Sequence, residues 1–121
     1  MVLEYCELGT LDEHVTSIRG KHGRQGLHEE TAKVIFGQLC NALTYCHDNG
    51  IVHRNLKSKS VLLDSQLNVK LADFCLAKIL QTFSWRALLV HPICSDCMQY
   101  SAPEMFYARR YDGIRADIWS L

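Results

Sequence analysis

The sequence has little of several features that mark specialised classes of protein. Only two of its 121 residues are proline, and no internal repeat, low-complexity segment or proline- and serine-rich linker divides the chain. Basic and acidic residues are balanced, 13 against 13, so the formal net charge is zero. Surfaces that bind nucleic acids or anionic membranes carry an excess of Lys and Arg. We therefore expect neither a nucleic acid nor a membrane as a partner.

Long hydrophobic runs are also missing. The longest uninterrupted aliphatic stretch covers residues 87–90, whereas a helix that spans a bilayer needs roughly 18 apolar residues. Residues 1–8 contain no basic segment before an apolar core, so we expect no signal peptide. Hydrophobic residues nevertheless make up 48% of the chain, which is enough to oppose the entropy of ordering and predicts one folded domain at most.

Cysteine is present at six positions. Without a secretory signal, the reducing cytoplasm or nucleus is the expected location, and free thiols are expected rather than disulfides. Cys94 and Cys97 form a CxxC pair, but a zinc site needs a second pair at suitable spacing, and the sequence has none. Chance spacing in a loop is therefore favoured over a metal site.

Local patterns predict a mixture of helices and short strands. Thr10 or Asp12 is suited to cap a helix that reaches about residue 18. Residues 29–48 form the strongest predicted helix, because acidic residues occupy its first turn and Asn49-Gly50 ends it. Its predicted apolar face, at spacings of three and four, contains Ala32, Ile35, Phe36, Leu39, Ala42, Leu43 and Cys46.

The remaining segments are shorter. Residues 61–63 and 69–72 are expected to form a hairpin joined by turn-favouring residues 64–68. Residues 1–3 resemble the end of a strand, residues 51–52 a short buried run, and residues 101–107 and 116–121 helices. The basic, glycine-containing stretch 19–26 is predicted to be a solvated loop, because a phosphate-binding loop would need Gly-Lys-Ser/Thr leading into a helix after a strand.

Three short motifs follow one another in a specific order. They are His53-Arg54-Asn55-Leu56-Lys57-Ser58-Lys59-Ser60, then Asp73-Phe74-Cys75, then Ala102-Pro103-Glu104. With Glu4-Tyr5-Cys6 before them and Asp117-Ile118-Trp119-Ser120 after them, they resemble the eukaryotic protein kinases over the whole chain. Lys57 resembles the serine/threonine class, and the segments around residues 100–104 and 112–120 resemble its calcium/calmodulin-dependent and AMP-activated branch.

The resemblance implies an α+β fold: the mainly helical large (C-terminal) lobe of a kinase domain, truncated, with a small β-hairpin at the cleft. Residues 1–121 would be a partial domain that runs from the hinge to the start of the central helix, without the small lobe and the later helices. It also implies ATP and Mg²⁺ as cofactors, a protein substrate or binding partner, and phosphoryl transfer to a protein Ser or Thr.

The resemblance assigns roles to individual residues. Asn55 and Lys57 stand at catalytic positions, while Asp73 and Ser60 stand at the metal-ligand positions. Arg54 matches the arginine that pairs with a phosphorylated activation segment. His53 and Asp117 are expected to be structural, with Asp117 accepting backbone N–H groups of the catalytic loop. The cofactor-binding set is Leu3, Glu4, Cys6, Leu63 and Asp73.

Three departures from the family pattern predict weak or absent activity. Asn55 replaces the catalytic Asp, and an amide cannot accept a proton at neutral pH. Ser60 replaces the metal-ligand Asn with a shorter neutral oxygen ligand. Cys75 replaces the Gly of Asp-Phe-Gly, and its Cβ restricts the backbone. The sequence therefore indicates a catalytically impaired kinase domain fragment; the alternatives are a pseudokinase-type protein interaction module and a degenerate, non-functional copy.

Overall fold

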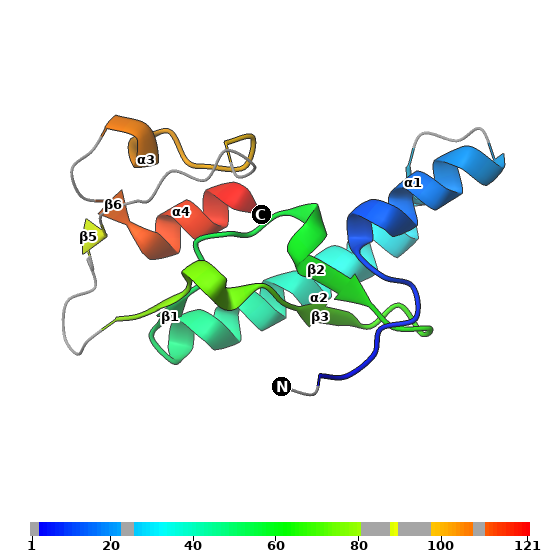
Figure 1. Ribbon diagram of the computed structural model, residues 1–121, viewed down its shortest axis with the longest axis horizontal. Coiled ribbons are helices and arrows are strands. Elements are labelled where there is room, and N and C mark those ends of the chain that lie inside the picture. Colours follow the sequence, from blue (N-terminus) through cyan, green and yellow to red (C-terminus); the bar gives the residue numbers. More distant parts are fainter. Residues whose placement is uncertain (1–2, 23–25, 81–87, 90–97, 108–110) are drawn as a thin grey trace. The chain divides into compact units, whose positions relative to one another are not determined.

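The computed structural model describes residues 3–22, 26–80, 88–89, 98–107 and 111–121 (Figure 1). The chain forms two compact units, and each is described by itself. Unit 1 combines Met1–Ala42 with Ser58–Ala72, and unit 2 combines Leu43–Lys57 with Asp73–Leu121. Neither unit contains a described helix long and apolar enough to cross a membrane. The CxxC pair at residues 94–97 lies outside the described residues.

Helix α1 (Leu11–His22) opens unit 1 with a reciprocal cap. Thr10 Oγ1 accepts a hydrogen bond from the Glu13 backbone N–H at 3.2 Å, and Glu13 Oε2 accepts from the Thr10 backbone N–H at 2.8 Å. The cap confirms Thr10 as the start, but the helix ends at His22 rather than near residue 18. The predicted loop was therefore wrong for residues 19–22: Arg and Lys are good helix formers, and one glycine in a helix costs only about 1 kcal/mol.

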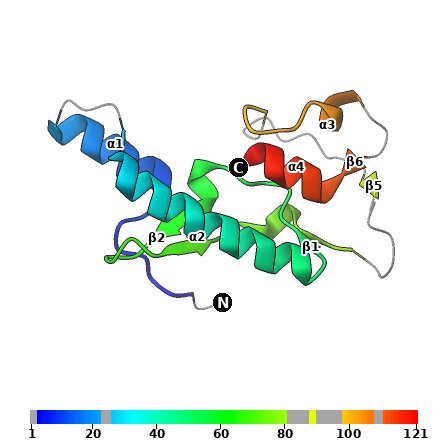
Figure 2. The ribbon, with the colours of Figure 1, turned by 180° about the vertical axis from the view of Figure 1, so that it is seen from behind.

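Helix α2 (Glu29–Asp48) has the predicted bounds, and the reverse view shows it as one continuous helix (Figure 2). Gly50 follows it with a φ of +70°, a conformation that suits glycine, which confirms the predicted end. The side chains of Ile35, Leu39, Leu43 and Cys46 are buried. Phe36, predicted to share this face, is 51% exposed, so the buried part of the face is narrower than predicted.

The predicted hairpin in unit 1 is confirmed. Strands β2 (Val61–Leu63) and β3 (Val69–Leu71) pair antiparallel, with Leu62 opposite Lys70. The N-terminal segment runs beside β2, since Leu8 N donates to Leu63 O at 3.2 Å and Leu63 N donates to Gly9 O at 2.9 Å. Leu3 lies outside any strand, so the strand end expected at residues 1–3 is wrong for the one described residue of that stretch.

The turn of this hairpin is held from two sides. Asp64 Oδ1 accepts from the backbone N–H groups of Gln66 at 2.9 Å and Asn68 at 2.8 Å. From α2, the Gln38 amide donates to Leu67 O at 3.2 Å and accepts from Val69 N at 2.8 Å. A single-turn 3₁₀ helix, η1 (Ser58–Ser60), leads into β2.

Unit 2 contains two short antiparallel pairs and two helices. Strand β1 (Ile51–Val52) pairs with β4 (Lys78–Ile79), and β5 (Leu88–Leu89) pairs with β6 (Tyr111–Asp112). The 3₁₀ helix η2 (Phe74–Leu76) precedes β4. Helix α3 covers Glu104–Tyr107 and α4 covers Gly113–Ser120. Strands β1 and β4 contain two residues each. Segments this short show no hydrophobic periodicity from which their pairing could be predicted.

Both predicted helices of unit 2 have different starting points from those expected. Helix α3 begins at Glu104 rather than residue 101. Helix α4 begins at Gly113 rather than residue 116, because Asp112 Oδ1 accepts from the backbone N–H groups of Ile114 at 3.0 Å and Arg115 at 3.3 Å. Asp112 is thus the N-cap of α4.

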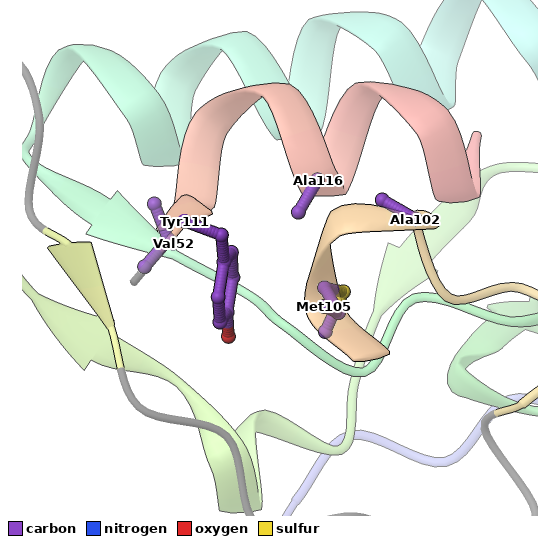
Figure 3. Close-up of a cluster of buried hydrophobic side chains, with 5 residues drawn as sticks. All are labelled: Val52, Ala102, Met105, Tyr111 and Ala116. Carbon is purple, nitrogen blue, oxygen red and sulfur yellow. The ribbon is translucent and has the colours of Figure 1, made fainter. Parts of the chain in front are cut away.

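The core of unit 2 gathers side chains from four elements and the loop before α3 (Figure 3). Its fully packed members are Val52, Ala102, Met105, Tyr111 and Ala116, with Leu80 and Ile114 packed against them. This core lies beside the loop that follows β1, and that loop carries the candidate catalytic residues.

Candidate functional site

The loop after β1 is anchored by one buried carboxylate. Asp117, on α4, accepts the backbone N–H of His53 on Oδ2 at 2.8 Å and that of Arg54 on Oδ1 at 2.7 Å. His47, at the end of α2, places Nε2 2.9 Å from the same Oδ2. The expected role of Asp117 as an acceptor for the loop backbone is confirmed, whereas the contribution of His47 was not predicted, because nothing in its local sequence indicates a partner 70 residues away.

His53 is structural, as expected. Its side chain is completely buried, and its Nδ1 accepts the backbone N–H of Asn55 at 3.3 Å. Its ring packs against Phe74 with 4.6 Å between the ring centroids. A fully buried ring with these contacts helps to position the loop.

Three of the predicted site residues come together in unit 2: Asn55, Lys57 and Asp73. The Asn55 amide donates from Nδ2 to Asp73 Oδ2 at 2.7 Å. The Lys57 ammonium lies 4.0 Å from the same carboxylate oxygen. Asp73 has a left-handed backbone with φ 62° and ψ 51°, and its side chain is 39% exposed. The arrangement presents a negatively charged oxygen ligand beside a fixed positive charge.

Cys75 completes this group. Its sulfur lies 3.9 Å from Asn55 Nδ2. A side-chain hydrogen bond with Asp73 raises the pKa of the Cys75 thiol. The residue that replaces the family glycine is therefore part of the polar network around Asp73.

The other predicted site residues belong to unit 1. Ser60 and Leu63 are fully buried there, whereas Leu3 is exposed and Cys6 is half-buried. Glu4 forms an ion pair with Lys70, with 3.1 Å between Oε1 and Nζ. The metal role of Ser60 and the cofactor-binding roles of Leu3, Glu4, Cys6 and Leu63 stay predictions.

Arg54 has a partner that sequence reasoning missed. Its Nε donates to the Tyr111 hydroxyl at 3.0 Å, and Tyr111 is buried in the core of unit 2. Burial raises the pKa of the Tyr111 hydroxyl, while the Arg54 guanidinium acts in the opposite direction. The two residues lie 57 positions apart, and no local signal links them.

The Asp73 carboxylate is a suitable ligand for Mg²⁺ that is bound together with a nucleotide. Within the described ranges no group of three or more His, Cys, Asp or Glu side chains is placed to hold a metal ion. Mg²⁺ is commonly held by one or two carboxylates together with substrate phosphates rather than by a cage of protein ligands. A single half-exposed carboxylate is compatible with that mode of binding.

Comparison with known proteins identifies the family. The family model for the protein kinase domain matches residues 1–121, and the chain belongs to this family. It is 40% identical over 124 residues to testis-specific serine/threonine-protein kinase 5 of Mus musculus, covering 100% of this chain and 32% of the relative. It is also 41% identical over 120 residues to CBL-interacting protein kinase 1 of Oryza sativa subsp. japonica, covering 99% and 24%.

A third relative is the carbon catabolite-derepressing protein kinase of Secale cereale, 36% identical over 122 residues, covering 99% of this chain and 22% of the relative. The chain thus spans between about a fifth and a third of the length of these relatives. The comparisons confirm the resemblance to serine/threonine kinases, and the described helices and small antiparallel sheets match the expected α+β class.

Proposed function

We propose that this chain is the part of a serine/threonine kinase domain that handles Mg²⁺–ATP through Asp73 and is impaired in phosphoryl transfer. The observation that carries the proposal is the hydrogen bond from Asn55 Nδ2 to Asp73 Oδ2, at 2.7 Å. At the position where the family has a carboxylate, this chain has an amide whose N–H group is already committed to Asp73. The metal-binding carboxylate is retained and the general base is lost.

The chemistry follows from these groups. Mg²⁺, when bound, would neutralise phosphate charge beside Asp73. Lys57, 4.0 Å from Asp73, supplies a positive charge where charge on a transferring phosphoryl group must be stabilised. Asn55 can orient a substrate hydroxyl but cannot take its proton, because an amide is not basic at neutral pH. Loss of a general base costs about 10²–10⁴ in rate.

The first test measures catalysis. Purified protein is incubated with Mg²⁺–ATP and a generic serine-containing peptide, in parallel with the Asn55→Asp and Asp73→Ala variants. We expect the unmodified chain to show a rate at the level of Asp73→Ala, and Asn55→Asp to exceed it by about 10² or more. Robust peptide phosphorylation by the unmodified chain that disappears in Asp73→Ala would sink the claim of impairment.

The second test measures binding separately from catalysis. A thermal melt is recorded with and without Mg²⁺–ATP, since a ligand that binds only the native state raises the melting temperature. The proposal predicts an upward shift for the unmodified chain and none for Asp73→Ala. A melt that Mg²⁺–ATP leaves unchanged in both proteins contradicts nucleotide handling through Asp73.

A second candidate function is a non-catalytic protein interaction module. It is favoured by exposed large apolar side chains in unit 2, which include Phe106, Tyr107, Ile118 and Trp119. Partners recovered with the unmodified chain and identified by mass spectrometry are compared with those of an Ile118→Ser, Trp119→Ser double variant. Equal partner sets count against this alternative.

A further inference from the structure

One oxygen of the Asp73 carboxylate lies beside two hydrogen-bond donors. Asn55 Nδ2 contacts Oδ2 at 2.7 Å, and the Lys57 ammonium lies 4.0 Å from the same oxygen. A carboxylate only accepts hydrogen bonds, so the amide presents its NH₂ group to Asp73. Oδ2 of Asp73 is therefore engaged by the chain's own groups.

The hydrogen bond from Asn55 Nδ2 to Asp73 joins a neutral donor to an ionised acceptor. A hydrogen bond to an ionised acceptor is shorter and about twice as strong as one between neutral groups. Asn55 is only 5% exposed, and its backbone N–H is held by His53, so the amide is fixed in place. A divalent cation that binds Oδ2 competes with this donor, because the N–H already occupies one of the two lone pairs of the oxygen and its partial positive charge repels a metal ion.

We propose that Asn55 is a positioning residue that clamps Asp73 in a cation-free form and competes with divalent cations for Oδ2. The inference rests on the proposed function, because both concern the Asp73 carboxylate. It adds to that proposal the regulation of the site: the residue that removes the general base also lowers the affinity of the metal ligand.

A carboxylate at residue 55 would repel Asp73 instead of donating a hydrogen bond to it. In the unmodified chain 2.7 Å separates Asn55 Nδ2 from Asp73 Oδ2. Two carboxylate oxygens at that separation would repel each other, and a shared cation would relieve the repulsion. Asn55→Asp should therefore turn a self-satisfied pair into a pair that binds a divalent cation. Asn55→Ala removes the competing donor without adding charge and separates the two effects.

The experiment uses Mn²⁺ alone as the probe. The free Mn²⁺ signal is followed by electron paramagnetic resonance as the full chain, Asn55→Asp and Asn55→Ala are titrated. Asn41→Asp is the matched control, because Asn41 is exposed on α2 and the variant adds the same charge away from Asp73. We expect Asn55→Asp to bind Mn²⁺ at least roughly tenfold more tightly than the unmodified chain, the scale on which neighbours of metal ligands act.

The other variants complete the test. Asn55→Ala should bind at least as tightly as the unmodified chain, and Asn41→Asp should match it. Equal affinities for Asn55→Asp and the unmodified chain overturn the proposal, as does an equal gain in Asn41→Asp. Weaker binding by Asn55→Ala also overturns it, because Asn55 would then be a ligand rather than a competitor.

Thermal melts give an independent measurement. Without a divalent cation, Asn55→Asp should melt below the unmodified chain and recover most of the difference in saturating Mn²⁺. Asn55→Ala has no like-charge repulsion to relieve, so Mn²⁺ should raise its melting temperature by less than that of Asn55→Asp. An Asn55→Asp melt that is insensitive to Mn²⁺ contradicts the clamp. No nucleotide or peptide is present, so failure of ATP binding or phosphoryl transfer leaves these readouts unaffected.

Discussion

Asp117 illustrates how one side chain determines the conformation of a functional loop. Its two oxygens accept the backbone N–H groups of His53 and Arg54 and contact His47. Arg54 has a φ of +66°, a left-handed conformation that is unfavourable for a residue with a Cβ. The hydrogen bonds to Asp117 offset that cost and direct Asn55 toward Asp73.

The Asp117→Asn variant tests this anchor. One oxygen becomes an NH₂ group that faces a backbone donor, so a buried N–H loses its acceptor. We expect the free energy of unfolding to fall by about 1–3 kcal/mol, measured by urea denaturation. The matched control is Asp48→Asn, which is exposed at the end of α2 and should change stability by less than about 0.5 kcal/mol. Equal effects of the two variants would contradict the anchoring role.

At the residue scale, the sequence predicted which residues belong to the site better than it predicted the contacts between them. The resemblance identified Asp117 as an acceptor for the loop backbone, and the structure confirms it. The hydrogen bond between Asn55 and Asp73 joins residues 18 positions apart, and it depends on the backbone of both. No pattern within either motif predicts that these two side chains meet.

At the scale of elements, helix ends were decided by side-chain caps. Thr10 and Glu13 fix the start of α1, and Asp112 fixes the start of α4. The first was predicted because Thr10 and Asp12 were both candidates. The second was missed because residues 113–115 include a glycine and carry a weak apolar pattern, while the cap itself lies before them.

The α1 cap makes a prediction about pH. The hydrogen bonds from the Thr10 backbone and side chain lower the pKa of Glu13 below its ordinary value. A lowered folded-state pKa means that the contribution of the cap to stability is complete above the ordinary pKa and is lost as pH falls through the folded-state pKa. In an NMR titration, the Glu13 carboxyl should titrate below the ordinary range and return toward it in Thr10→Ala.

Thr10→Ser is the matched control, because it keeps a hydroxyl at the cap position and should leave the Glu13 carboxyl titrating below the ordinary range. An unchanged Glu13 titration curve in Thr10→Ala would show that the Thr10 hydroxyl does not contribute to the shift, and a Glu13 carboxyl that titrates in the ordinary range in the unmodified chain would contradict the cap.

At the scale of the whole molecule, stability depends on compact cores of modest size. The core of unit 2 contains side chains from β1, α3, β6 and α4, which are far apart in the sequence. The core therefore forms only when these elements pack together. The free energy of unfolding of an ordinary domain is about 5–15 kcal/mol. The loss of one large core side chain is therefore a substantial fraction of the total.

The two methionines of unit 2 provide a matched comparison. Met105 is 6% exposed and belongs to the core, whereas Met98 is 54% exposed. Met105→Ala should lower the free energy of unfolding by about 2–5 kcal/mol, because it removes buried methylene groups and leaves a cavity. Met98→Ala should lie within about 0.5 kcal/mol of the unmodified chain. The measurement is chemical denaturation monitored by circular dichroism, and similar losses for both variants would show that the core is not formed as described.

The sequence by itself determined the family, the α2 helix with both of its ends, the β2–β3 hairpin and the identities of the residues at the site. These properties depend on motifs and periodicities within short stretches, where local conformational preference and burial act on the same residues. Only the tertiary structure decided the β1–β4 and β5–β6 pairings, the Arg54–Tyr111 contact and the hydrogen bond that joins Asn55 to Asp73. Each of these depends on where separate segments meet, which is decided by packing of the core and by buried polar groups that must find partners.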